Sequence, residues 1–488
     1  MRKRFEQQIV IGRLLIQDTE IPTARRSGAL PGLCAALKEI FVTPEWNEKV
    51  FEILENQIYA ESNNVGRPGM NLWQIFVLSQ VRLCQNISYD DLHHVANNDR
   101  LIRQIMGIEN EFGYSRETLG YQRIIDNVGL LSDETVKKLN AVIVEFGHQV
   151  FKKKEDEEAL NLKTDSFVVE SNVHFPTDYN LLWDSARKSL DMVTKVQEKY
   201  DLQGWRKIKD WRKDLKNKMR ALGRASASGG KEKRNRIKTA TQKYLTKASA
   251  LLVKLEKEKD SFPCVDVADS IIIIELDRFM KLLQKHIDLL ERRIIKGEKI
   301  SHDEKMFSIF EEYTEWVTKG KMRPNVELGK KASITTDQFN LIIDYQIMEH
   351  QSDSEIVPGL AGRIFSRYTV ASWSFDKGYW HKNNKTLLSE KVETLVLPKK
   401  GKCNKVEYAQ EHQPRFLKFR ERHSAVESNV NELEHRGLDR CPDRGYSHFK
   451  RYVGLAVSAF NLRKIGKELI RQSIQKEQES CKHRKTAA

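Results

Sequence analysis

Hydrophobic periodicity changes twice along this chain, and those changes restrict the fold more than any other feature of the sequence. Residues 159–171, ALNLKTDSFVVES, alternate polar and apolar side chains as a half-buried strand does. After HFPTD the pattern becomes helical and stays so until strand-like segments resume near residue 326. One strand cut off from the others by a long helical stretch predicts an α/β domain interrupted by a large all-helical insertion.

The insertion carries two heptad stripes, each with residues spaced alternately four and three apart. They are Ile237, Thr241, Tyr244, Ala248, Leu251 and Leu255, and then Leu276, Met280, Leu283, Ile287, Leu290 and Ile294. Because SFPCVDVADS separates the stripes, we expect an antiparallel helical hairpin, with pairing between two chains as the alternative. The segment RASASGG, residues 224–230, predicts a flexible joint before the first stripe.

Strand patterns return in the second half of the chain. VELGKKASITTD and FNLIIDYQIME predict a hairpin, RYTVASWSFD predicts a strand that ends at Asp376, and VETLVLPKK predicts one more strand. The expected order is strand, insertion, two strands, strand, helix, strand and then helices to the end. No Gly-rich phosphate loop of either nucleotide-binding type is present, so we expect no nucleotide cofactor.

Residues 1 to about 155 have a helical pattern. Apolar residues at helical spacing end at NIS, and Ser88 with Asp91 three residues later is a variant of the capping signature that starts a new helix. A second start at Ser115 leaves Arg116 and Arg123 available to touch DNA. The alternative interpretation is a helical bundle that packs without any ligand.

The charge balance favours a polyanionic partner. The chain has 83 Lys and Arg against 68 Asp and Glu, a net charge of +15, and residues 201–240 hold fourteen of these bases against four acids. The longest aliphatic run, Ile271 to Ile274, is far short of the roughly 20 residues that a membrane-spanning helix needs. We therefore expect nucleic acid rather than a membrane, and no export signal is recognisable at the start.

The cysteines point to a reducing compartment. Six are present and none forms a CxxC pair, which excludes both a disulfide framework and the common zinc motifs. The expected location is the cytoplasm.

Three acids stand out by position: Asp165 in the first strand, Asp376 at the end of a later strand, and Glu427 in a helix after the last strand. Cutting or joining a phosphodiester requires charge neutralisation and an activated oxygen nucleophile. Two Mg²⁺ ions held by carboxylates supply both. The plain alternative is that these acids are helix caps or solvated groups. Asp178, Glu170, Asp344 and Glu432 are the next candidates.

Several segments resemble the catalytic blocks of bacterial insertion-sequence transposases of the DDE class, nearest to the ISNCY-like group. They are LKTDSFVVESNVHFPTD, VELGKKASITTD, SFDKGYW and the segment that begins RERHSAVESNVNELEHRG. The resemblance implies an RNase H-like α/β core with a mixed five-stranded sheet and flanking helices. It assigns the metal-binding, catalytic triad to Asp165, Asp376 and Glu427, with two Mg²⁺ ions as cofactor and Mn²⁺ as a substitute.

The chain departs from that family in one signature. Many relatives have Arg four residues before the Glu and Lys seven residues after it, where this chain has His423 and Glu434. Arg420, Arg422 and Arg436 are the candidates to replace those charges. The other basic residues expected to contact DNA are Arg116 and Arg123 near the N-terminus and Arg206, Lys207, Arg212, Lys213, Arg220, Arg234 and Arg236 in the insertion.

The resemblance also extends to the N-terminal segment NISYDDLHHVANNDRLIRQIMGI, and it implies four parts. These are a helix-turn-helix-like DNA-binding domain at 1–155, a catalytic domain at 156–179 and 325–475, the helical insertion at 180–324, and a basic tail at 476–488.

The function implied is that of a DNA transposase. As a homodimer on double-stranded DNA, it would bind the terminal inverted repeats of its element, free a 3′-hydroxyl by hydrolysis, and transfer that strand to target DNA. Its expected place is the nucleoid of a bacterial cytoplasm. A structure-selective nuclease on the same fold and a non-catalytic DNA-binding protein derived from a transposase are the alternatives. A plain coiled-coil scaffold is a third, which the alternating strands disfavour.

Overall fold

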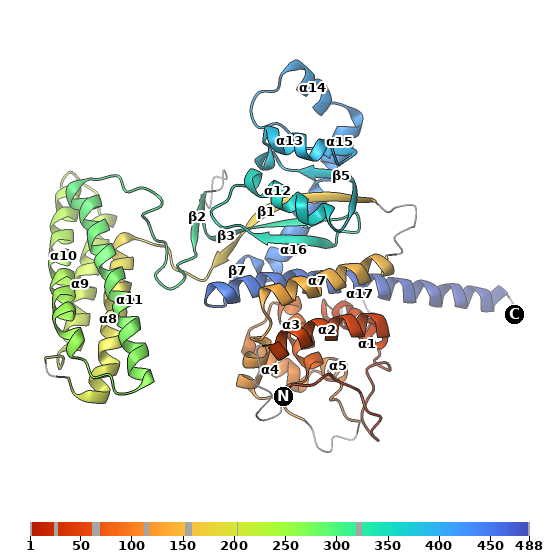
Figure 1. Ribbon diagram of the computed structural model, residues 1–488, viewed down its shortest axis with the longest axis horizontal. Helices are drawn as coiled ribbons and strands as arrows, with labels where there is room; N and C mark the ends of the chain where they lie inside the picture. The colour runs from red at the N-terminus through yellow and green to blue at the C-terminus, as the bar shows by residue number, and fades with distance from the viewer. Residues whose placement is uncertain are drawn as a thin grey trace. The chain divides into compact units, whose positions relative to one another are not determined.

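The computed structural model describes residues 2–23, 28–60, 69–111, 117–151, 159–202, 204–318 and 325–486. These residues form two compact units. The first combines Met1–Asn172 with Val317–Ala488, and the second is Val173–Trp316 (Figure 1). The chain therefore leaves the first unit after one strand and returns to it, as the change in periodicity predicts.

A mixed sheet forms the centre of the first unit. The hydrogen-bonded path is β2–β3–β1–β5–β6, with β4 paired to β3 and β7 paired to β1. β1 runs antiparallel to β3 and parallel to β5, and β5 runs parallel to β6. The strands are β1 (Ala159–Ser171), β2 (Glu315–Thr318), β3 (Val326–Thr336), β4 (Ile342–Ile347), β5 (Thr369–Phe375), β6 (Thr394–Val396) and β7 (Arg440–Cys441).

The two faces of β1 and β5 differ in chemistry because side chains alternate along a strand. Leu162 pairs with Trp373 in the parallel ladder, and both belong to an apolar core that also contains Val357 and Leu360 of helix α12 (Asp353–Phe365). The residues in between, which include Lys163 and Asp165 on β1, belong to the opposite face. One face is thus apolar and packed against α12, and the other carries these polar side chains.

The seven strands of the described residues exceed the five expected. β2 and β7 are four and two residues long, too short to give a recognisable alternation. Helix α12 between β4 and β5 was also not anticipated, although its capping box, Ser352 with Glu355, is present in the sequence. The hairpin of β3 and β4 and the strands before Asp376 and at VETLV are confirmed.

Helices from both ends of the chain complete the first unit. Those before the sheet are α1 (Leu30–Val42), α2 (Pro44–Ala60), α3 (Leu72–Gln85), α4 (Tyr89–Asn98), α5 (Arg100–Ile105), α6 (Tyr121–Val128) and α7 (Asp133–Val150). Those after β5 are α13 (Lys382–Ser389), α14 (Lys405–Glu411), α15 (Pro414–Glu421), α16 (Ser424–Leu433) and α17 (Tyr446–Thr486). The predicted cap is confirmed, since the Ser88 side chain accepts a hydrogen bond from the Asp91 backbone N–H.

The N-terminal helices are not set apart from the sheet, because α17 packs against α1, α3, α7 and β4. A Cβ on Gly466 would lie 1.6 Å from the Gly32 carbonyl oxygen, so α1 and α17 touch through their backbones. The Asn461 side chain bonds both the N–H and the C=O of Ile342 and donates to Asn140 of α7. The expected tail at 476–488 is a continuation of α17 as far as Thr486.

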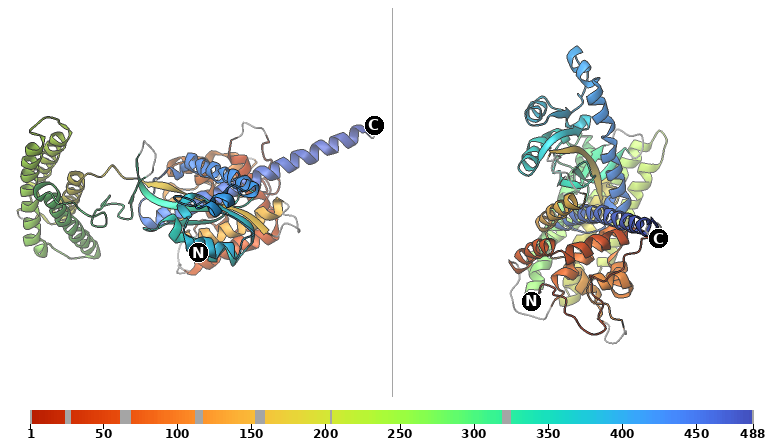
Figure 2. Two further views of the ribbon diagram at one scale, coloured as in Figure 1. Left: turned by 90° about the horizontal axis from the view of Figure 1, so that it is seen from above. Right: turned by 90° about the vertical axis from the view of Figure 1, so that its right-hand side faces the viewer.

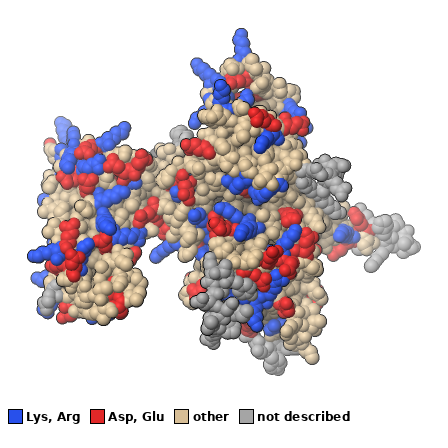
Figure 3. All heavy atoms as spheres, in the orientation of Figure 1, with Lys and Arg blue, Asp and Glu red and all other residues tan. Residues whose placement is uncertain are grey.

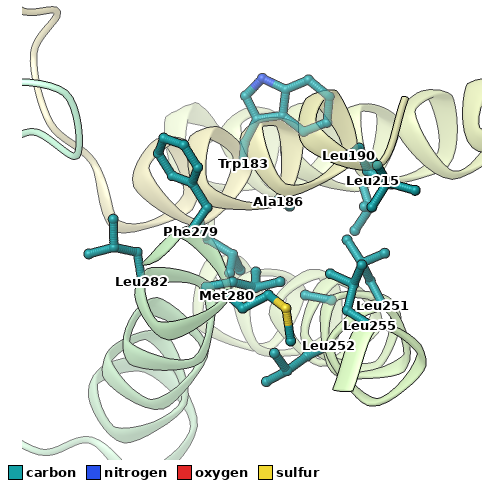
Figure 4. Packing of buried hydrophobic residues seen from close by; sticks show 14 of the residues in the cluster. Trp183, Ala186, Leu190, Leu215, Leu251, Leu252, Leu255, Phe279, Met280 and Leu282 are labelled. Atoms are coloured by element: carbon teal, nitrogen blue, oxygen red, sulfur yellow. The ribbon is translucent and has the colours of Figure 1, made fainter. Parts of the chain in front are cut away.

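The second unit is a bundle of α8 (Asp178–Tyr200), α9 (Ile208–Ala227), α10 (Lys233–Glu258) and α11 (Val267–Leu290) (Figures 1 and 2). The two heptad stripes pack within one chain, since α10 contacts α11 and both contribute to one core (Figure 4). That core is larger than a hairpin, because Trp183, Ala186 and Leu190 of α8 and Leu215 of α9 also enter it. The joint predicted at 224–230 is confirmed only in its second half, because α9 continues to Ala227 and the break lies at 228–232.

The heptad register gives a test of this packing. Leu251 is fully buried in the bundle, whereas Val253, two residues further along α10, is 62% exposed. We expect Leu251→Ala to lower the free energy of unfolding by about 2–5 kcal/mol, because it leaves a cavity. Val253→Ala is the control and should cost no more than about 0.5 kcal/mol. Denaturant unfolding measures both, and equal losses would contradict the register.

Candidate active site

The site is built at the end of the β1–β5 ladder. Thr164 pairs with Phe375 in that parallel ladder, so Asp165 and Asp376, the next residue of each strand, leave it as neighbours. Asp165 is partly buried, and its Oδ1 accepts a hydrogen bond from the Ser166 N–H at 2.7 Å. Asp376 is exposed.

A tight turn redirects the chain after Asp376. Lys377–Tyr379 form a single 3₁₀ turn, and the Asp376 side chain caps it by accepting the Gly378 N–H at 3.4 Å. A Cβ at 378 would lie 2.9 Å from Oδ2 of Asp353, so a larger residue there would displace the Asp353 carboxylate. Tyr379 anchors the turn, since its ring is buried and its hydroxyl lies 3.1 Å from Oγ of Ser333 on β3.

Helix α16 carries Glu427 and packs against β1. Its start is fixed to β5 by His423, whose Nδ1 lies 3.0 Å from Oγ of Ser374 on the polar face of the strand. Val426 and Leu433 point into the core, while Glu427 is exposed in the first turn. A carboxylate at that position is favoured by the helix dipole.

The electrostatics link the three acids. The pKa of Asp165 is raised to about 6, mainly by burial and in addition by the negative charges of Asp376, Glu427 and Asp353. Burial also lowers the pKa of His423, while Asp376 and Glu427 act in the opposite direction. The charges of Asp376 and Glu427 therefore act on the same two residues, Asp165 and His423, although these residues are far apart in sequence.

Within the described part of the chain, neither Asp376 nor Glu427 forms a salt bridge with a basic side chain. In contrast, each of the four next candidates from the sequence forms a salt bridge with arginine. Asp344 binds Arg363 and Arg367, Glu432 binds Arg463, Glu170 binds Arg440, and Asp178 binds Arg293. Among these seven acids, the unpaired ones are those that the resemblance assigns to the triad.

Carboxylate oxygens are the donors that Mg²⁺ prefers, so the donor set fits a hard divalent cation. The three side chains do not form a complete metal-binding site in this structure. Across the described ranges, no three His, Cys, Asp or Glu groups lie close enough together to hold an ion as they stand. Binding would therefore require the three side chains to draw together.

One acid at the site was missed from the sequence. Asp353, the first residue of α12, accepts from Nζ of Lys331 at 2.7 Å with both oxygens and from Oγ of Ser166 at 2.7 Å. Its charge also acts on Asp165. The capping box of Ser352 and Glu355 could have predicted the helix that begins at Asp353, but not the contact of Asp353 with Ser166. Because Lys331 neutralises Asp353, we assign it to support of the turn at Gly378.

The basic residues expected near Glu427 and in the N-terminal helices separate into two groups. Arg123 and Arg436 serve the fold, because they donate to the carbonyls of Gly69 and Cys84. Arg420 and Arg422 are exposed. Arg116 lies outside the described residues.

The bases of the insertion are almost all at its surface. Arg212 is half-buried and binds Asp191, whereas the other six are exposed, namely Arg206, Lys207, Lys213, Arg220, Arg234 and Arg236. On the face seen in Figure 3, the Lys and Arg side chains of the insertion are interspersed with Asp and Glu. The bases are thus accessible but do not form an unbroken patch on that face.

Comparison with known proteins adds no relative. No protein-family model, no curated protein and no solved structure matches the chain. Among the helices of the described residues, none combines the length and apolarity that crossing a bilayer requires.

The raised pKa of Asp165 predicts a pH-dependent stability. Since the folded pKa, about 6, lies above the ordinary 3.8, ionisation opposes folding. The penalty is absent below about pH 4, grows up to about pH 6 and then stays constant. Without divalent cations, Asp165→Asn should therefore be more stable than the parent at about pH 8, by ~3 kcal/mol, and equal to it at low pH.

Asp344→Asn is the matched control, because it removes a carboxylate that is ion-paired and buried. It should lose about 1–3 kcal/mol at the same pH. Denaturant unfolding across pH measures both variants. A loss for Asp165→Asn as large as that for Asp344→Asn would contradict the unneutralised site.

Proposed function

We propose that the protein is a DNA transposase of the DDE class with an RNase H-like core. The observation that carries the proposal is electrostatic. The charges of Asp376 and Glu427, acids distant from Asp165 in sequence, both act on Asp165 and on His423, and neither acid forms a salt bridge among the described residues. Repulsion among these negative charges lowers folding stability, and a bound cation would compensate for it. The mixed sheet with helices on its strands is consistent with the core that the resemblance implies.

Asp165, Asp376 and Glu427 would hold the metal ions. When bound, two Mg²⁺ ions supply charge neutralisation at the phosphodiester and activation of the attacking oxygen, first of water and then of the freed 3′-hydroxyl. The chain itself contributes position. The β1–β5 ladder fixes two carboxylates side by side, and the contact between His423 and Ser374 fixes the start of the helix that carries the third.

The remaining parts have separate roles in the proposal. The N-terminal helices would recognise the terminal inverted repeats, and the exposed bases of the insertion would hold phosphates of double-stranded DNA. Two element ends must be brought together, so we expect a homodimer on DNA. The structure-selective nuclease is the second candidate, since the same carboxylates would serve hydrolysis alone.

Asp376→Asn tests the catalytic assignment. The substitution keeps the shape of the side chain and removes one ligand charge, so Mg²⁺-dependent nicking of element-end DNA should fall by more than about 100-fold. Binding of Mn²⁺ measured by calorimetry without DNA should weaken in parallel. Glu170→Gln removes a surface carboxylate that binds Arg440 and should retain nicking close to that of the parent.

Normal nicking by Asp376→Asn would refute the proposed site. Nicking without strand joining by the parent would favour the nuclease. Binding of DNA by the parent, with neither reaction in Mg²⁺ or Mn²⁺, would favour the non-catalytic DNA-binding protein.

A further inference from the structure

A cavity of about 340 Å³ opens on the polar face of β1 and β5, beside the carboxylates. Lys163, two residues before Asp165, lines it together with Ser374, whose hydroxyl contacts His423. Gln338 and Asn340, from the turn between β3 and β4, contribute another wall, and Arg422 contributes a third. Donors from three separate segments therefore surround one space.

Two positive charges face this cavity without a free counterion. Lys163 and Arg422 both line the cavity, and Nζ of Lys163 donates to the backbone carbonyl of Asp337 at 3.3 Å. The Asp337 carboxylate is itself occupied, by His148 at 2.7 Å and by the backbone N–H groups of Phe339 and Leu341. Within the described residues, the Arg422 guanidinium forms no ion pair.

The amide side chains of the turn are incompletely bonded. Oε1 of Gln338 accepts the Asn161 N–H at 3.0 Å, which leaves its buried Nε2 without a protein partner. Oδ1 of Asn340 is likewise buried and unbonded. A buried donor without a partner is costly, so the Gln338 amide N–H group favours an occupant of the cavity that accepts hydrogen bonds. Oδ1 of Asn340 is an acceptor and does not contribute to binding an anion.

We propose that this cavity binds a phosphate group of the DNA backbone, next to the phosphodiester that the carboxylates would hold. A phosphate offers several acceptor oxygens and a negative charge, which matches two cations and an amide donor that converge from different segments. The phosphate would supply a counterion to both Lys163 and Arg422, which line the same cavity. The identity of the polymer rests on the proposed function, whereas the anion follows from the cavity.

Gln338→Glu is the sharpest test. The carboxylate keeps the oxygen that accepts the Asn161 N–H, so the fold should be retained, but it replaces the unbonded donor by a negative charge that faces the phosphate. In the catalytically silent Asp376→Asn protein, this second change should weaken binding of a short duplex oligonucleotide by about 10-fold or more. Gln351→Glu is the control, since it makes the same charge change at an exposed position outside the cavity and should bind as the parent does.

Salt dependence shows whether the two cations hold one phosphate. Lys163→Met and Arg422→Met should each lower the slope of log affinity against log salt by up to about 0.9, the contribution of one phosphate contact. The double variant should lower it by no more than about the same amount. Additive slopes would mean two separate phosphates and would overturn the shared site.

The outcomes also separate this inference from the proposed function. If the parent cleaves DNA in Mg²⁺ while Gln338→Glu binds duplex normally, the cavity inference is wrong and the transposase proposal stands. If the parent never cleaves but Gln338→Glu still loses DNA binding, the cavity stands and the catalytic proposal fails. Absence of any DNA binding by the parent overturns both.

Discussion

The parallel pairing of β1 with β5 is the interaction on which the rest of the first unit depends. It places Trp373 and Phe375 with Leu162 in the apolar core and, by alternation, assigns Lys163, Asp165, Ser374 and Asp376 to the opposite face. A shift of one residue in this register would exchange the two sets and expose the core. The position of the carboxylates is therefore specified by the same hydrophobic contacts that stabilise the sheet.

Asp165 differs from several other acidic side chains of the first unit, because those acids form ion pairs with basic residues. Asp344, Glu432 and Glu170 each face an arginine, and Asp353 faces Lys331. Asp165 instead lies where burial and like charges oppose its ionisation. Asp165 is thus uncompensated where these four acids have a basic partner, and it lowers stability, which is the usual relation between a functional site and its scaffold.

Much of the fold could be predicted from the sequence, because long periodic patterns survive in the structure. The heptad stripes, the β3–β4 hairpin and the cap at Ser88 are all found where periodicity or capping chemistry indicates. The short strands β2 and β7 left no detectable period, and the N-terminal helices looked independent because the glycine contact of Gly32 with Gly466 joins residues that no local pattern relates.

The site could be predicted only in part. Spacing along the chain drew attention to Asp165, Asp376 and Glu427, but the choice of these three over Glu432 or Asp344 came from resemblance and not from physics. The structure adds a physical criterion for choosing among the acids, since it shows which of them already form an ion pair with a basic residue. The support given by Asp353 and the cavity lined by Gln338 depend on tertiary neighbours and have no signature in the sequence.

The backbone contact between α1 and α17 has a consequence for synthesis. Gly32 emerges from the ribosome before the sheet and the insertion, and Gly466 emerges after them, yet the two residues pack against each other. The helical insertion closes on local partners and is free to fold while translation continues, whereas the sheet must wait for Asn461 to reach Ile342. A prematurely terminated polypeptide would thus contain every acid of the triad and still lack a finished framework to hold them.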